Sequence, residues 1–245
     1  MRLDITSAAE RPDRAPLWSG LTGLWPRFMT QDETGDFFYG YEFDHYPEFQ
    51  LLAVDLDTGD AVAKAHSVPL SFTGAIADGL PGHGWDWAVR QATHDRLSGA
   101  EPAIVSALEI MVRPDLRSHG LSARMLAALR ANTAARGFTD LIAPVRPIGA
   151  QGRNIDTYAY EQRPDGLPVD PWLRVHVRAG GRIVNVAHTS MVMVGTLADW
   201  RRWTELPFDT SGAVTVPHAL GPVHCDVAGN RAVYVEPNVW VHHKL

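Results

Sequence analysis

The chain reads AIVSALEIMV-RPDLRSHG-LSARMLAALRANTAARG over residues 103–137, and this stretch decides the fold. Its first ten residues are apolar at nearly every position, which predicts a central strand covered on both faces. After a short turn, leucines and a methionine recur at helical spacing over 120–136, and Gly137 is suited to cap that helix at its C-terminal end. The stretch therefore predicts a buried strand, a turn and an amphipathic helix.

The turn between this strand and this helix is suited to bind an anion. A helix begins with backbone N–H groups that have no intrahelical acceptor, and its dipole favours negative charge there. Gly120 has no side chain, so a diphosphate can approach the backbone closely. The turn has neither the G-x-G-x-x-G pattern of a dinucleotide site nor the lysine of a Walker loop. We therefore expect a phosphate site of another kind.

The rest of the chain predicts a mixed α/β protein around this stretch. The turn Asp57–Asp60 joins two strands, because Gly59 allows a positive φ. Residues 1–14 predict a loose lead-in, and residues 15–30 have helical spacing that Pro26 interrupts. The other predicted elements are strands at 50–56, 62–69, 141–145 and 183–194, helices at 84–98, 170–179 and 197–204, and short strands near 214–216, 223–227 and 232–235.

Composition excludes several classes of function. The chain has 245 residues, of which 45% are hydrophobic, and a net charge of −6, so we expect a buried core and no nucleic-acid partner. No apolar run is long enough to span a membrane, and no apolar segment follows the charged start, so we expect a protein without membrane or signal segments. The one cysteine, Cys225, excludes a disulfide framework and a Cys-rich zinc site, and it fits a cytoplasmic protein.

The phosphate-binding turn resembles the motif of the GNAT superfamily of acyl-CoA-dependent N-acyltransferases. The family pattern is Arg or Gln, two residues, Gly, one residue, and then Gly or Ala. Here Arg117 and Gly120 match it, and Ser122 takes the last small position. The lead-in Val112-Arg113-Pro114 and the closing Arg136-Gly137-Phe138 match the family as well. The chain is also similar to actinobacterial members of the superfamily.

This resemblance covers about residues 50–185 and implies a GNAT fold, which is an α/β (α+β) fold with a splayed mixed central β-sheet flanked by helices. Extra short C-terminal strands would join it. We therefore expect a single domain over 1–245, with a core at about 15–195 and a C-terminal extension at 196–245. A late strand from Tyr234 to Val241 would complete the sheet, cover its edge or pair across a dimer, so a monomer or a homodimer is expected.

The resemblance implies acetyl-CoA, or another acyl-CoA, as the co-substrate and the amine of a small molecule as the acceptor, with no metal. Backbone groups near Met111 and Val112 would hold the pantetheine arm between two parallel strands. Backbone amides of the next turn would hold the pyrophosphate; the residues of that site are Arg117, Ser118, His119, Gly120, Leu121 and Ser122.

A general acid is expected near the helix at 170–179. His176 falls where the family has a tyrosine that protonates the leaving thiolate, and a histidine is suited to this because its unperturbed pKa lies near neutrality. The alternative is a surface histidine near a helix C-terminus, where positive charge is favoured. Tyr158 and Tyr160, in the preceding loop, are rival acids.

Glu109 is the candidate general base, because it is the carboxylate within the apolar strand. Burial would raise its pKa toward a useful range. Regular alternation places Glu109 on the face opposite to Leu108 and Ile110, and a β-bulge, which the family fold has, would change this parity. A structural carboxylate is the alternative role, and His66 is a second candidate base.

The reaction expected from these residues is direct attack of the amine on the thioester in a ternary complex. Backbone N–H groups would hold the oxyanion, and no nucleophile is placed for a covalent intermediate. Two alternatives remain open: another reaction of a CoA thioester, such as decarboxylation or O-acyl transfer, and a non-catalytic CoA-binding module. The fold by itself does not choose between them.

Overall fold

The computed structural model describes residues 2–117 and 119–245. Within these residues nine strands form one sheet, in the order β1-β2-β3-β4-β5-β9-β8-β7, with β6 paired to β9. The strands are β1 (Leu3–Ser7), β2 (Gln50–Asp55), β3 (Ala61–Leu70), β4 (Ile104–Val112), β5 (Asp140–Val145), β6 (Arg182–Gly195), β7 (Gly212–Val214), β8 (Val223–Asp226) and β9 (Arg231–Lys244).

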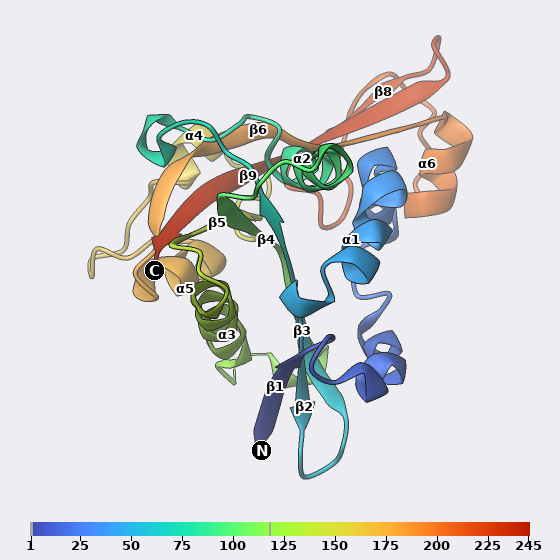
Figure 1. The fold of residues 1–245 in the computed structure, drawn as a ribbon. Coiled ribbons are helices and arrows are strands. Elements are labelled where there is room, and N and C mark those ends of the chain that lie inside the picture. Colours follow the sequence, from blue (N-terminus) through green and yellow to red (C-terminus); the bar gives the residue numbers. More distant parts are fainter. Residues whose placement is uncertain (1, 118) are drawn as a thin grey trace.

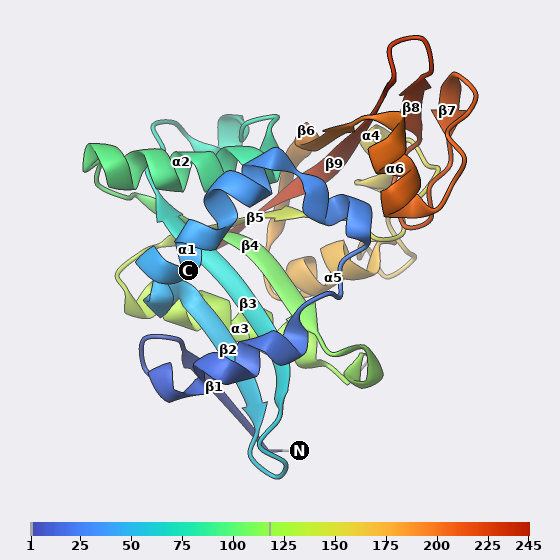
Figure 2. The same ribbon diagram turned by 90° about the vertical axis from the view of Figure 1, so that its right-hand side faces the viewer.

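Helices cover both faces of this sheet. They are α1 (Gly40–His45), α2 (Gly84–Ser98), α3 (Leu121–Ala135), α4 (Ile155–Tyr158), α5 (Pro171–Arg178) and α6 (Leu197–Thr204). The two longest, α2 and α3, lie on opposite sides of the sheet (Figure 1), and each packs into a separate apolar cluster. At one end of the sheet, β7 and β8 lie beside α6 (Figure 2).

The helix after the predicted phosphate-binding turn forms as expected from its apolar stripe. Leu121, Met125 and Leu129 are almost fully buried, so one face of α3 packs against the sheet. Gly120 precedes the helix with φ +75° and Gly137 follows it with φ +86°, both in the left-handed region. The predictions of a helix here and at 84–98 are confirmed.

The central feature of the sheet is the separation of β4 from β5. These strands run parallel but pair only at Val105 with Leu141 and at Ser106 with Ile142. Beyond these pairs the two strands have no common register, so the sheet opens toward the C-terminal ends of both strands. The expected mixed α/β architecture with a splayed central sheet is confirmed.

A β-bulge decides which way the side chains of β4 point. His66 of β3 pairs with Glu109, but the next residue, Ser67, pairs with Ala107, so Leu108 is the additional residue. Ala107 and Ile110 both belong to the cluster beneath α3, whereas Leu108 belongs to the cluster beneath α2. The bulge therefore changes the parity of the strand, and Glu109 lies on the same side as Leu108.

The C-terminal strand lies inside the sheet. β9 pairs antiparallel with β5, from Asp140 with Lys244 to Val145 with Val239, and pairs with β6 along its length. Of the three roles left open for this strand, it has the first, completion of the sheet. The predicted strand near 232–235 is present, but it is part of a longer strand, because β9 is fourteen residues long. The segment 196–245 thus supplies a central strand.

Two expectations for the N-terminal region are wrong. Residues 3–7 are not a loose lead-in but form the edge strand β1, which pairs with β2. The apolar spacing in 15–30 does not give an α-helix; this region contains the 3₁₀ segments Pro12–Leu21 and Arg27–Gln31, which pack over the sheet. Among the described residues, no helix combines the length and the apolar character needed to cross a membrane.

Candidate active site

A cavity of about 390 Å³ lies where β4 and β5 separate. This volume is within the range of small-molecule sites, roughly 300–1,000 Å³. Residues 107–110 of β4 and 143–145 of β5 form its base. The polar and aromatic side chains around it are Trp25, Asp32, Asp36, Tyr39, Lys64, Trp85, Glu109, Arg146, Trp172, His176, Glu236 and Asn238.

Glu109 is held on this wall by three side chains. Trp25 Nε1 donates a hydrogen bond to Oε1 (2.7 Å), the Tyr39 hydroxyl donates one to Oε2 (2.7 Å), and Lys64 Nζ lies 3.3 Å from Oε2. Burial raises the pKa of Glu109, but the neighbouring His66, the charge of Lys64 and the two hydrogen bonds outweigh it, so the net pKa is lowered. The expectation of a raised pKa is therefore wrong, and Glu109 is a stable anion.

His66 lies next to Glu109, with its Nε2 3.6 Å from Oε2 of the carboxylate. The other ring nitrogen, Nδ1, is 2.7 Å from Gln50 Oε1. The Gln50 amide nitrogen is bonded to backbone carbonyls, so its oxygen is the acceptor and Nδ1 carries the hydrogen. Burial lowers the pKa of His66 to about 4, so the ring is neutral near pH 7.

His176 is buried at the other side of the cavity, on α5. Its Nδ1 lies 2.9 Å from Nε2 of His243, which is also buried. Burial, and then His243, lowers the pKa of His176 to about 3. His176 is therefore not a surface residue, and its ring is neutral near pH 7. A neutral imidazole is poorly suited to protonate a leaving thiolate.

Tyr158 lies apart from the cavity. Its hydroxyl is 3.3 Å from Asp170 Oδ2, and its ring packs with Ala150 and Leu220 in a separate cluster. Burial and the Asp170 charge raise the pKa of Tyr158 to about 12. Tyr160 is 51% exposed. The structure thus brings Glu109 and His176 to one cavity and leaves Tyr158 outside it.

The predicted pyrophosphate site has the geometry of an open helix N-terminus. No side chain of the described residues caps α3, so its first N–H groups are available. No atom lies within 4 Å of the position that a Cβ of Gly120 would take. His119 Nδ1 lies 2.9 Å from the Arg117 carbonyl. Of the other predicted residues, Met111 and Val112 end β4, Leu121 and Ser122 begin α3, and Ser118 lies outside the described residues.

Asp32 and Asp86 form a carboxyl pair beside the cavity that the sequence analysis missed. Both are buried and hydrogen-bonded to each other, and Asp32 lies on the cavity wall. Burial, and then the neighbouring Asp32, raises the pKa of Asp86 to about 8, while burial also raises that of Asp32. The pair therefore retains a proton near neutral pH. No local sequence pattern indicates that these two residues lie together.

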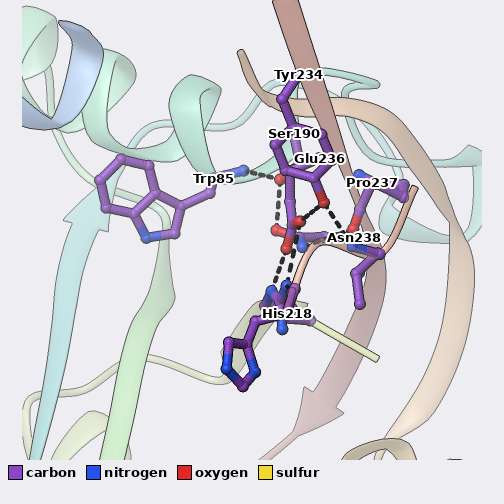
Figure 3. A network of polar contacts seen from close by, with 9 residues as sticks. Trp85, Ser190, His218, Tyr234, Glu236, Pro237 and Asn238 are labelled. Atoms are coloured by element: carbon purple, nitrogen blue, oxygen red, sulfur yellow. Dashed lines mark hydrogen bonds and ion pairs between the residues drawn. The ribbon is translucent and has the colours of Figure 1, made fainter. Parts of the chain in front are cut away.

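A second missed network surrounds Glu236 of β9 (Figure 3). Arg146 Nε and the Tyr234 hydroxyl both donate to this fully buried carboxylate. Arg146 Nη2 also donates to the His218 carbonyl (2.5 Å). The sequence contains one indication of this network, since Arg146 directly follows a predicted strand.

Asn238 lies two residues farther along β9 and is linked to the start of α2 through Ser190. Ser190 Oγ donates to Asn238 Oδ1 (2.5 Å) and accepts a hydrogen bond from the Trp85 backbone N–H (2.8 Å) (Figure 3). These bonds fix the start of α2 against β6 and β9. Trp85 and Asn238 are both on the cavity wall, so the same bonds shape the cavity.

Comparison with known proteins gives one curated relative and many structural neighbours. No protein-family model matches the chain. The chain is 29% identical, over 98% of its length and 93% of the relative's, to an arginine N-acetyltransferase of Aspergillus versicolor. It superposes over its whole length on the loading GNAT-like domain of CurA from Lyngbya majuscula (98% of that chain, TM-score 0.58, 16% identity). The GNAT-like decarboxylase GphF in complex with isobutyryl-CoA gives similar values (100% of this chain, 99% of that chain, TM-score 0.54, 16% identity).

Proposed function

We propose that this chain, which has the fold of the GNAT acyltransferases, transfers the acetyl group of acetyl-CoA to an amine of a small basic molecule, arginine or a close analogue. The observation that carries this proposal is the cleft between β4 and β5, which opens into a cavity with charged walls. The arginine N-acetyltransferase that is related to the chain over nearly its full length supports the choice of acceptor.

Acetyl-CoA would bind along the unpaired edges of β4 and β5. The pantetheine arm needs hydrogen-bonding backbone, and β4 beyond Ser106 has no partner on β5 to occupy its backbone groups. The pyrophosphate needs N–H donors and room, and the start of α3 at Gly120 offers both. Arg117 adds a positive charge directly before this turn.

The charges on the cavity wall favour a cationic acceptor. Lys64 is paired with Glu109, and Arg146 is paired with Glu236. Asp36 is in no ion pair among the residues that the structure describes, and Asp32 is joined to Asp86, whose carboxyl group lies 3.9 Å from Arg90 outside the cavity wall. A guanidinium or ammonium group would supply the missing positive charge, and its approach would expel the proton that the Asp32–Asp86 pair holds.

In the reaction, the amine nitrogen attacks the carbonyl carbon of the thioester, the C–S bond breaks, and CoA leaves as thiolate. An ammonium group has no lone pair, so it loses one proton before the attack, and the nitrogen loses a second proton, which converts the thiolate to the free thiol, as the C–S bond breaks. We assign Glu109 to hold the incoming ammonium group and to receive the first of these protons, because it is the anion on the β4 side of the cleft. His176 is a weaker candidate for the general acid because its buried ring is neutral, and Tyr158 is a weaker one because it lies outside the cavity.

Binding of the nucleotide and transfer are tested separately. Acetyl-CoA should raise the melting temperature of the wild-type protein, because a ligand that binds the folded state stabilises it. Arg117→Glu should remove this shift, while Arg231→Glu, an exposed site on β9, should keep it. With arginine present, free thiol should appear and an N-acetyl product should be found by mass spectrometry. Absence of both the thermal shift and the thiol would contradict the proposal.

A further inference from the structure

Arg146 lies on the cavity wall with a guanidinium group that the protein holds in one orientation. It directly follows β5, and its side chain is 18% exposed. Nε donates to Glu236, while Nη2 donates to the His218 carbonyl (2.5 Å) and lies 3.5 Å from Glu236 Oε2. The remaining nitrogen, Nη1, has no hydrogen-bond partner among the residues that the structure describes.

The partners of Arg146 are themselves fixed. The Tyr234 hydroxyl donates to Glu236 and accepts a hydrogen bond from the Leu220 backbone N–H (2.8 Å). Tyr234 and Glu236 are both fully buried. The loop around His218 and the strand β9 are therefore tied together behind the guanidinium, so that its position does not depend on a bound ligand.

A guanidinium with one free nitrogen on a cavity wall is suited to bind a carboxylate. Arginine keeps its charge at all relevant pH values and donates in a fixed plane, and hydrogen bonds between charged groups are stronger than neutral ones. Glu236 does not cancel this capacity, because both of its oxygens face Nε, Nη2 and Tyr234.

We propose that Arg146 binds the carboxylate of the acceptor, so that the enzyme selects an amino acid over the amine without the carboxylate. This inference rests on the proposed function. It accounts for a cavity that has a cationic group on the β5 side and the carboxyl groups of Asp32 and Asp36 on the N-terminal side. A basic amino acid carries the complementary charges at its two ends.

The test compares two acceptors that differ in the carboxylate: arginine and agmatine. Loss of one charged hydrogen-bond partner costs about 1.5–3 kcal/mol, which is roughly a 10- to 100-fold change. We expect the wild-type kcat/KM for arginine to exceed that for agmatine by this factor. In the double variant Arg146→Gln/Glu236→Gln, which leaves no unpaired buried carboxylate, the ratio should fall toward one, mainly through a higher KM for arginine.

Two further variants separate recognition from folding. Arg146→Lys keeps the charge and the ion pair with Glu236 but loses the planar fork, so the ratio should fall partway. Arg153→Gln, an exposed arginine of the neighbouring loop that pairs with Glu161, should leave the ratio at the wild-type value. All variants should still gain melting temperature with acetyl-CoA, which shows that the fold and the nucleotide site are intact.

The outcomes are distinguishable. An unchanged arginine-to-agmatine ratio in the Arg146 variants, or a wild-type ratio near one, overturns the inference while transfer itself persists. No thiol release with either amine and no shift with acetyl-CoA overturns the proposed function instead. The carboxylate could also belong to the acyl group: if malonyl-CoA gives acetyl-CoA without an acceptor, and only when Arg146 is present, the assignment to the acceptor is wrong.

Discussion

His66 and Glu109 are partners across the β3–β4 ladder, and the register of the ladder slips by one residue directly beyond them. The slip places the Glu109 carboxylate beside the His66 ring, with Nε2 3.6 Å from Oε2. It also turns the carboxylate toward Trp25 and Tyr39 of the N-terminal region, which donate to its two oxygens. One additional residue in a strand thus decides the position of the candidate base.

Glu109→Gln should lower kcat/KM for arginine by about 100-fold, because it removes both the anion that holds the ammonium and the group that receives the proton. The pKa of Glu109 is lowered from 4.5, so its charge is unchanged between pH 5 and 7. The variant should therefore be slower at every pH in this interval, and its plot of kcat/KM against pH should have the same shape as that of the wild type. An acid limb that is present in the wild type and absent in the variant would contradict this.

The buried histidines should make the fold sensitive to acid. The folded-state pKa values of His176 (about 3) and His243 (about 4) lie below the ordinary value of 6.5. The unfolded chain therefore binds more protons between pH 4 and 6.5, and stability falls as the pH falls through this window, by about 1.4 kcal/mol per pH unit for each group. Above pH 6.5 this contribution is complete.

The measurement is urea unfolding at several pH values for the wild type and for His176→Phe/His243→Leu. The slope of the unfolding free energy against pH from 4.5 to 6 should be smaller in the double variant. The exposed His94→Ala variant serves as the control and should keep the wild-type slope. Equal slopes in wild type and double variant would show that the pair is not neutral in the folded state.

Glu42 should have the opposite effect on stability. Burial raises its pKa to about 8, and its Oε2 has no hydrogen-bond partner among the described residues. The folded state keeps a proton that the unfolded state loses above pH 4.5, so stability declines as the pH rises from 4.5 to 8. Glu42→Gln should be more stable than the wild type at pH 8 and gain little at pH 5. The exposed Glu101→Gln should show no such difference in urea unfolding.

Gly120 and Gly137 flank α3 and have the same backbone conformation, so each serves as a control for substitution of the other. Both have a positive φ, and neither would place a Cβ within 4 Å of another atom. Alanine at either position should cost about 1 kcal/mol of stability, because the left-handed conformation disfavours a Cβ. Gly120→Ala should in addition weaken acetyl-CoA binding at least tenfold in calorimetry, since the Cβ occupies the space of the pyrophosphate. Equal affinity in both variants would place the pyrophosphate elsewhere.

Gly84 at the start of α2 should not tolerate a side chain. A Cβ there would collide with the Ser190 hydroxyl, which is bonded to Asn238 on the cavity wall. Gly84→Ala should lose about 1–3 kcal/mol from overpacking, together with part of its activity. Gly82→Ala, two residues earlier with open space around it, is the control and should stay near the wild type in thermal unfolding.

Local patterns in the sequence determined the elements that we propose to form the nucleotide site. The apolar run of β4, the glycine at 120 and the leucine stripe of α3 each act within a few residues of one another, so their effects are visible in the chain itself. The same holds for the β2–β3 hairpin turn and for the helix at 84–98. The resemblance to the GNAT superfamily rested on this local agreement.

The acceptor side of the cavity was decided only by tertiary structure. β9 reaches β5 across about a hundred residues, and with it Glu236 comes to lie against Arg146. Asp32 meets Asp86, and His176 meets His243, in the same way. Such contacts depend on which strands pair and where a bulge shifts the register. The pKa of a buried group depends on all of its neighbours at once, so a residue type and its position could nominate Glu109 and His176 but could not give their charge.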